Sequence, residues 1–206
     1  IAAALLGLCV ASPSWAQNAA DWKPSKPVRI MVPIVGSTND VLARLVAPKL
    51  QEVFGQPFVV ENKGGAGGNI GTLDVVRSAP DGHTLLVGYN GPLAINVSLF
   101  SKMPYDPVKD LAPITLAVKA PQYLVVNPAT GITNVKDFIA TARTNPEKLN
   151  YGSVSVGSAS HLTMEMMKSE AGFNITHIPY RGAAPAVSDL VAGNVQAAFF
   201  VPGNVQ

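Results

Sequence analysis

The sequence of 206 residues is short of cysteine, aromatic side chains and charge. It has one cysteine, Cys9, 7% aromatic residues and 14% charged residues. A single cysteine excludes an intramolecular disulfide and a cysteine zinc cluster, and the few aromatics leave little surface for stacking on sugars. The 15 Lys and Arg residues are dispersed singly, so no basic run would neutralise a row of phosphates. We therefore expect no nucleic-acid partner.

Metal ligands and cofactor motifs are equally scarce. The histidines His83, His161 and His177 are scattered, and no two are spaced i, i+4. The glycine cluster "GGAGGNIG" (residues 64–71) fails as a dinucleotide fingerprint, because Ile70 stands where the third glycine belongs, and no P-loop lysine follows. We expect neither a metal nor a cofactor. The cluster favours a flexible turn that lets the next helix approach the sheet closely.

The first 20 residues predict a secretory signal. "IAAALLGLCVASPSWAQNAA" carries no charge, and its apolar run is followed by Pro13 and by the small residues Ser14 and Ala16. The run is too short to cross a bilayer, which takes about 20 residues. A buried N-terminal helix is the alternative. With Cys9 inside the signal, the exported chain would have no thiol nucleophile.

Short apolar runs alternate with amphipathic segments along the rest of the chain, which is typical of an open parallel α/β sheet. The pattern predicts two α/β lobes, residues 21–113 and 119–206, joined near residues 113–119. The predicted strands are 28–32, 57–62, 83–90, 149–153, 173–180 and 195–200, with two extended segments in 110–128. The predicted helices are 37–55, one within 64–82, 134–145, 158–172 and 184–194.

The segment "NYGSVSVGSASHL" (residues 150–162) runs from a predicted strand into a predicted helix. It misses the G-x-S-x-G pattern of an α/β hydrolase by one position. Unpaired N–H groups, the helix dipole and the hydroxyls of Ser153, Ser155 and Ser158 favour capture of an anion. Ordinary helix capping by Ser158 or Ser160 is the alternative.

A second segment, "PIVGSTND" (residues 33–40), also runs from a strand end to a helix start and offers small polar donors. Ligands of open α/β sheets bind at the carboxyl ends of the strands. We expect these two loops, one in each lobe, to close on opposite sides of one small anion.

From residue 22 to residue 206 the chain resembles the Bug/TctC family, the solute-binding receptors of tripartite tricarboxylate transporters. The motifs that carry the resemblance are "KPVRIMVP", "NDVLARLVAPKL", "GQPFVVENKGGAGGNIG", "APDGHTLLVG", "INVSLFSKMPYDPVKDLAPIT", "NPEKLNYGS", "SHLTMEMM" and "HIPYRGAAPAVSDLVAGNVQAAF". The resemblance implies a two-lobed periplasmic-binding-protein fold of type II, which closes on a carboxylate through main-chain amides, hydroxyls and waters. Family chains continue past "VQAAFF", so the C-terminal part of the fold is expected to be missing here.

The resemblance implies ligand-binding residues at matching positions and no catalytic residue. They are Gly36, Ser37, Thr38, Asn39, Asn90, Ser153, Ser155, Gly157 and Ser158. The family usually has glycine where Ser155 stands.

The implied function is that of a periplasmic receptor in a Gram-negative bacterium, not an enzyme. It would bind an amino acid, a di- or tricarboxylate or an aromatic acid and deliver it to integral membrane transporter subunits. Two alternatives stay open. One is a ligand-sensing module that docks on a membrane signalling protein. The other is a secreted serine hydrolase that uses Ser153, Ser155 or Ser158 with His161.

Overall fold

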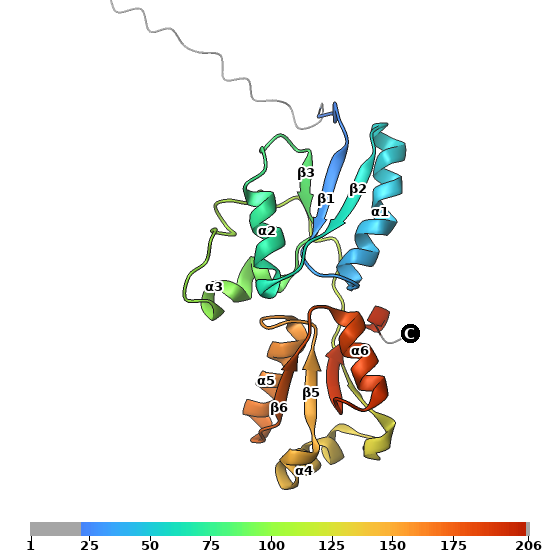
Figure 1. Cartoon of the computed structure of the whole chain (residues 1–206), viewed down its shortest axis with the longest axis vertical. Helices are drawn as coiled ribbons and strands as arrows, with labels where there is room; N and C mark the ends of the chain where they lie inside the picture. The colour runs from blue at the N-terminus through green and yellow to red at the C-terminus, as the bar shows by residue number, and fades with distance from the viewer. Residues whose placement is uncertain (1–21, 205–206) are drawn as a thin grey trace, which may run out of the picture.

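Two separate sheets organise the chain, and each forms the centre of one α/β lobe (Figure 1). The structure is a computed structural model that describes residues 22–204. The predicted signal therefore lies outside the described residues. The predicted lobe boundaries, 21–113 and 119–206, stay a prediction.

The first lobe contains a parallel sheet of strand order β2-β1-β3, flanked by α1 and α2 (Figure 1). Its elements are β1 (Val28–Val32), α1 (Thr38–Phe54), β2 (Phe58–Asn62), the 3-10 turn η2 (Ala66–Gly68), α2 (Asn69–Val76), β3 (Thr84–Leu86), the π-helix η3 (Gly91–Ile95) and α3 (Asn96–Leu99). Its core comprises Val28, Ile30, Val32, Ile34, Ala43, Ala47 and Phe58.

The second lobe contains a mixed sheet of strand order β4-β7-β5-β6. Its elements are β4 (Tyr123–Val126), the 3-10 turn η4 (Pro128–Thr130), α4 (Val135–Thr144), the 3-10 turn η5 (Pro146–Lys148), β5 (Asn150–Ser153), α5 (Ala159–Ala171), β6 (Thr176–Pro179), α6 (Ala183–Ala192) and β7 (Ala197–Phe200), followed by the 3-10 turn η6 (Pro202–Asn204). Two buried clusters support this sheet, one around Phe138 and Tyr151 and one around Leu190 and Phe200.

The helices next to the predicted loops begin and end where the sequence signals place them. Helix α1 begins after Ser37, whose hydroxyl accepts the Asp40 N–H, and ends at Gly55 with φ of 70°. Helix α5 begins after Ser158, whose hydroxyl accepts the His161 N–H, and ends at Gly172 with φ of 63°. Capping oxygens and left-handed glycines satisfy the polar groups that helix ends leave open.

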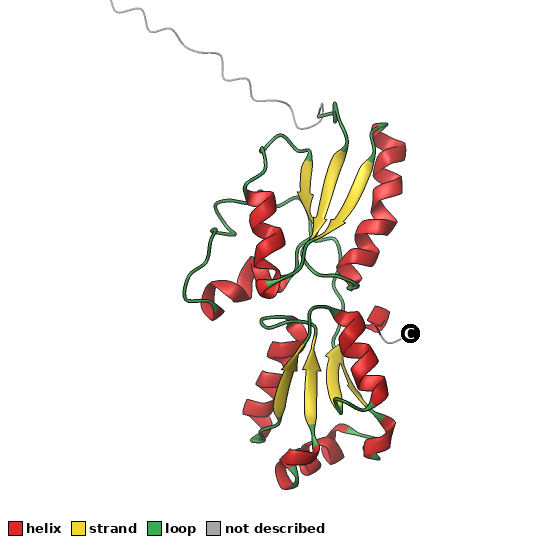
Figure 2. Cartoon of the chain, viewed as in Figure 1, coloured by secondary structure: helices red, strands yellow, loops and turns green. Residues whose placement is uncertain are grey.

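The strands of the two sheets point toward each other. Strands β1, β2 and β3 run toward the second lobe, whereas β5, β6 and β7 run toward the first (Figure 2). The carboxyl ends of both sheets, and the loops that follow them, therefore meet between the lobes.

Three sequence expectations were wrong in detail. The strand predicted for residues 83–90 is paired only over Thr84–Leu86. Residues 111–122 carry no regular structure, and their apolar side chains Ile114 and Leu116 are exposed, since no strand lies beside them. Strand β4 is antiparallel to β7 and not parallel to it. The chain enters β4 from the first lobe, so this strand has to run away from that lobe while β7 runs toward it.

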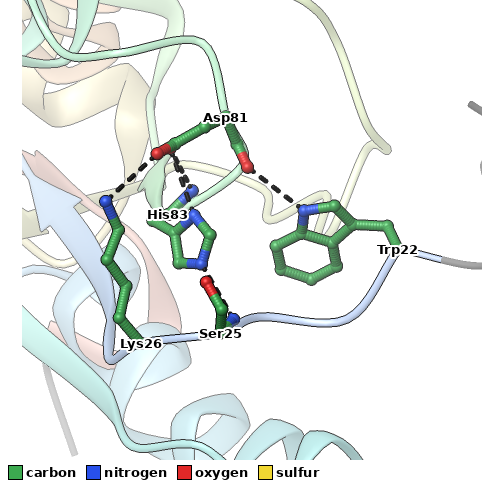
Figure 3. A network of polar contacts seen from close by, with 5 residues as sticks. All are labelled: Trp22, Ser25, Lys26, Asp81 and His83. Atoms are coloured by element: carbon green, nitrogen blue, oxygen red, sulfur yellow. Dashed lines mark hydrogen bonds and ion pairs between the residues drawn. The ribbon is translucent and has the colours of Figure 1, made fainter. Parts of the chain in front are cut away.

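Hydrogen bonds and an ion pair connect residues 22–26 to the loop before β3 (Figure 3). Trp22 Nε1 donates to the Asp81 carbonyl at 3.1 Å, and Lys26 Nζ lies 3.2 Å from Asp81 Oδ2. The Ser25 N–H donates to His83 Nε2 at 3.2 Å, and His83 Nδ1 lies 3.2 Å from Asp81 Oδ1. Hydrogen bonds from the His83 N–H and from Lys26 lower the pKa of Asp81 to about 2. These contacts fix the segment that leads into β1.

Among residues 22–204, none of the helices combines the length and the apolar character that a membrane crossing requires.

Candidate ligand site between the facing strand ends

The first-lobe loop, residues 33–40, joins β1 to α1. Ser37 is buried, and its hydroxyl accepts the Asp40 N–H and lies 3.4 Å from the Ile34 carbonyl. Asn39 Nδ2 donates to the Gly88 carbonyl at 2.7 Å, which ties the loop to the end of β3. Thr38 Oγ1 is buried and has no hydrogen-bond partner among the described residues. Among the predicted side chains of this loop, Thr38 therefore has a hydroxyl oxygen that forms no hydrogen bond within the described residues.

The second-lobe loop, residues 153–160, joins β5 to α5 and is held by a run of hydrogen bonds. The Val154 N–H donates to Ser160 Oγ at 3.1 Å, and Ser158 Oγ donates to the Ser155 carbonyl at 2.7 Å. Ser158 Oγ and Ser160 Oγ are 2.9 Å apart. Since the Ser158 proton is used on the carbonyl, Ser160 has to donate to Ser158. Both hydroxyl protons therefore take part in hydrogen bonds within the loop and are not available to a ligand.

Ser153 points into the second lobe. The residue is fully buried, and its Oγ lies 2.7 Å from His177 Nε2. His161, the base of the hydrolase alternative, instead uses Nδ1 to accept the Gly157 N–H at 3.2 Å. The pairing of a loop serine with His161 that this alternative requires is therefore not formed.

The remaining predicted residues lie closer to the lobe–lobe boundary. Gly157 is buried with φ of 76°, and Gly36 is exposed with φ of 61°. Ser155 Oγ lies 3.5 Å from Tyr89 OH of the first lobe. Asn90 is exposed and immediately precedes the π-helix η3. A ligand-binding role for all nine residues stays a prediction.

An aromatic stack lies directly behind the second-lobe loop. The rings of His161 and His177 are stacked with centroids 4.2 Å apart, and His177 stacks on Tyr151 at 4.7 Å. Burial lowers the pKa of His177 to about 4, with His161 acting in the same direction and Glu165 opposing. Burial also lowers the pKa of His161. Both rings are therefore neutral at pH 7, and neutral His161 can accept the Gly157 N–H.

This stack predicts a pH dependence of stability. The folded-state pKa of His177 lies below the ordinary 6.5, so the unfolded chain binds more protons between pH 6.5 and pH 4. We expect the free energy of unfolding to fall by about 1 kcal/mol from pH 7 to pH 5, after a discount for the partial exposure of the ring. Urea unfolding at both pH values measures the change. The His177→Gln variant should lose most of the slope, and an unchanged slope would contradict the assignment.

The two lobes are in contact through pairs of residues that could not be predicted from the sequence. A Cβ placed on Gly182, before α6, would lie 2.6 Å from the Val35 carbonyl, and one on Gly36 would lie 3.6 Å from Ala184 Cβ. Val154 packs against the core clusters of both lobes. The first-lobe loop thus contacts the β6–α6 corner, whereas the second-lobe loop contacts η3 and α3. The β6–α6 corner was not among the predicted site residues.

Two cavities among the described residues are lined by residues outside these two loops. One, of about 300 Å³, is lined by Ala66, Asn69, Ile70, Leu73, Phe100, Lys102 and Pro104. The other, of about 460 Å³, lies on α4. Residues 22–204 contain no group of three or more His, Cys, Asp or Glu side chains that would hold a metal ion.

The profile described as "Tripartite tricarboxylate transporter family receptor" matches residues 42–203. The chain belongs to this family. The resemblance seen in the sequence, the Bug/TctC family, is thereby confirmed.

Relatives within the TctC family agree in sequence and in fold. Protein BugT of Bordetella pertussis is 38% identical over 197 residues, which cover 94% of this chain and 60% of BugT. The solved structure of R. palustris Rpa4515 with adipate has a TM-score of 0.86 at 38% identity and covers 90% of this chain and 62% of that one. MatC of Rhodopseudomonas palustris, solved with bound malate, has a TM-score of 0.81 at 31% identity and covers 86% and 61%.

These likenesses confirm the predicted fold, a two-lobed α/β periplasmic-binding-protein fold. The chain spans about 60% of the length of the relatives that it matches.

Proposed function

We propose that the whole protein is a periplasmic receptor that binds a small carboxylate between its two lobes. The observation that carries the proposal is that α1 and α5 both begin after strands whose carboxyl ends face the other lobe (Figure 1). The backbone N–H groups of Thr38, Asn39, Ala159 and Ser160 have no acceptor among residues 22–204. Free N–H groups and the positive end of the helix dipole favour an anion at both places.

The hydrogen bonds within the two loops determine which backbone and side-chain donors remain available to a ligand. Ser158 and Ser160 have used their protons inside the loop, so the second lobe would offer N–H groups and the Ser155 hydroxyl. The first lobe would add N–H groups and Thr38 Oγ1, which has no partner among the described residues. Each charge-assisted hydrogen bond to a carboxylate contributes about 1.5–3 kcal/mol. Donors from two lobes can therefore hold such an anion without an arginine.

The ligand class is supported by the relatives. Rpa4515 was solved with adipate and MatC with malate, and both are dicarboxylates. Membership of the transporter receptor family and the signal-like residues 1–20 support a periplasmic location and delivery of the ligand to membrane transporter subunits. We propose a dicarboxylate or a closely related carboxylate for this chain.

Calorimetric titration of the purified chain with adipate and malate tests the proposal. Adipamide, in which both carboxylates are replaced by neutral amides, is the matched control ligand. We expect saturable binding of at least one acid and none of adipamide, because the helix starts select negative charge. Equal binding of adipate and adipamide, or no binding of either acid, would contradict the proposal.

The unused hydroxyl of Thr38 gives a residue-level prediction. The Thr38→Val variant keeps the shape and removes Oγ1, so affinity for the bound acid should fall roughly tenfold. Thr141→Val is the control, since Thr141 lies on α4, and its hydroxyl forms no hydrogen bond among the described residues. Calorimetric titration of both variants with adipate and malate measures the difference in affinity. A Thr38→Val protein that binds like Thr141→Val would remove Thr38 from the site.

A further inference from the structure

The tip of the second-lobe loop, Val156–Gly157, lies against first-lobe backbone with no space for side chains. A Cβ placed on Gly157 would lie 2.5 Å from Asn96 Oδ1 and 2.9 Å from Leu99 Cδ2. A Cβ on Gly67 would lie 2.9 Å from the Val156 carbonyl, and one on Gly91 would lie 3.2 Å from the Gly157 carbonyl. Glycines on both lobes therefore allow the two backbones to approach closely.

Asn96 is the polar centre of this contact. It is fully buried, and its Nδ2 donates to the Gly67 carbonyl at 3.0 Å and to Asn69 Oδ1 at 2.7 Å. Asn69 Oδ1 also accepts from Tyr105 OH at 2.9 Å. These bonds fix the orientation of the amide, so that Oδ1 faces Gly157. Asn96 Oδ1 is buried and has no hydrogen-bond partner among the described residues.

The contact is connected to the candidate ligand site through the chain itself. Gly157 directly precedes Ser158, which caps α5, and the Gly157 N–H is held by His161 Nδ1 on that helix. Any displacement of the tip would therefore move the first N–H groups of α5. Burial of an acceptor without a hydrogen bond lowers the stability of the folded protein. The stability of the first lobe alone therefore does not account for Asn96.

We infer that Gly67, Gly91 and Asn96 form the docking surface for Val156–Gly157, and that this interlobe contact positions the start of α5 for ligand capture. The inference rests on the proposed function for its ligand, but the contact itself does not depend on it. Gly67, Gly91 and Asn96 are positioning residues in this scheme, because they act through the loop and not on the ligand. The same contact explains why the glycine cluster of residues 64–71 lies beside a loop of the other lobe.

Two pairs of substitutions isolate the contact from backbone strain. Gly157→Ala and Gly67→Ala each introduce a methyl group into the interlobe contact at positive φ. Gly172→Ala and Gly55→Ala are the matched controls. Gly172 has φ of 63° at the end of α5, Gly55 has φ of 70° at the end of α1, and neither would bring a Cβ within 4 Å of another group. All four variants share the left-handed strain, and only the first two carry the clash.

The lobe separation is measured by pulsed electron paramagnetic resonance between spin labels on Gln51→Cys in α1 and Lys136→Cys in α4, with Cys9→Ser so that no other thiol is labelled. Both labelled positions are exposed. We expect Gly157→Ala and Gly67→Ala to shift the distance distribution to longer values than their controls. We also expect them to weaken binding of adipate or malate roughly tenfold, with controls within about twofold of the parent protein.

Distance distributions that match the controls for both variants would overturn the inference. If Gly157→Ala does not fold, Gly67→Ala, on the other lobe, decides alone. If the parent protein binds neither acid while the spin-label distances of the variants still differ from those of the controls, the proposed ligand class fails and the interlobe contact stands.

Discussion

Substitution of Gly71 with alanine is expected to lower the free energy of unfolding by about 2–3 kcal/mol. Gly71 lies in α2, where a Cβ would be 2.4 Å from the Lys63 carbonyl and 3.0 Å from Pro33 Cβ. Both neighbours belong to rigid backbone or a proline ring, so the helix has to move away from the sheet. Pro33 begins the first-lobe loop, and carboxylate binding should therefore weaken together with stability.

Gly64→Ala is the matched control in the same glycine cluster. A Cβ placed on Gly64 would have no other group within 4 Å, and the residue has no positive φ. Its substitution should leave urea unfolding within about 0.5 kcal/mol of the parent protein. Equal stability of Gly71→Ala and Gly64→Ala would show that α2 does not depend on this close approach.

The Phe138→Ala variant should lose about 3–5 kcal/mol of unfolding free energy, because a fully buried ring would leave a cavity in the second lobe. Phe138 packs edge-on against Phe173 with ring centroids 5.9 Å apart. The same cluster contains Tyr151, on which the histidine stack rests. The loss should thus also loosen the support of the second-lobe loop.

Val135→Ala on the same helix separates this effect from helix propensity, since Val135 is 52% exposed. Urea unfolding of this control should change by less than about 1 kcal/mol. A Phe138→Ala protein as stable as the Val135→Ala protein would contradict the assignment of Phe138 to the core.

Elements with local signals could be predicted from the sequence. Strand β1 and helix α1 occur where expected, because an apolar run, the cap Ser37 and the terminal Gly55 act within a few residues of each other. Helix α5 follows from Ser158 and Gly172 in the same way. The close approach of α2 to the sheet, expected from the glycine cluster, is seen at Gly71.

Features that depend on distant partners could not be predicted. The extended pattern of residues 111–122 forms no strand, because an exposed segment with no neighbouring strand has no ladder to join. The direction of β4 depends on where the chain crosses between lobes. The fully buried Ser153 bonds to His177 on β6, and strand pairing places these residues together although 24 positions separate them.

By itself, the sequence determined the family, the alternation of strands and helices, and the two strand-to-helix loops with polar residues, since short-range patterns encode all of them. Tertiary structure alone decided which atoms in those loops are still free to bind. It committed the hydroxyls of Ser153, Ser158 and Ser160 to internal bonds, left Thr38 Oγ1 without a partner among the described residues, and placed Asn96 opposite Gly157. The physical reason is that a hydrogen-bonding group is available only after every neighbour brought close by folding has been counted.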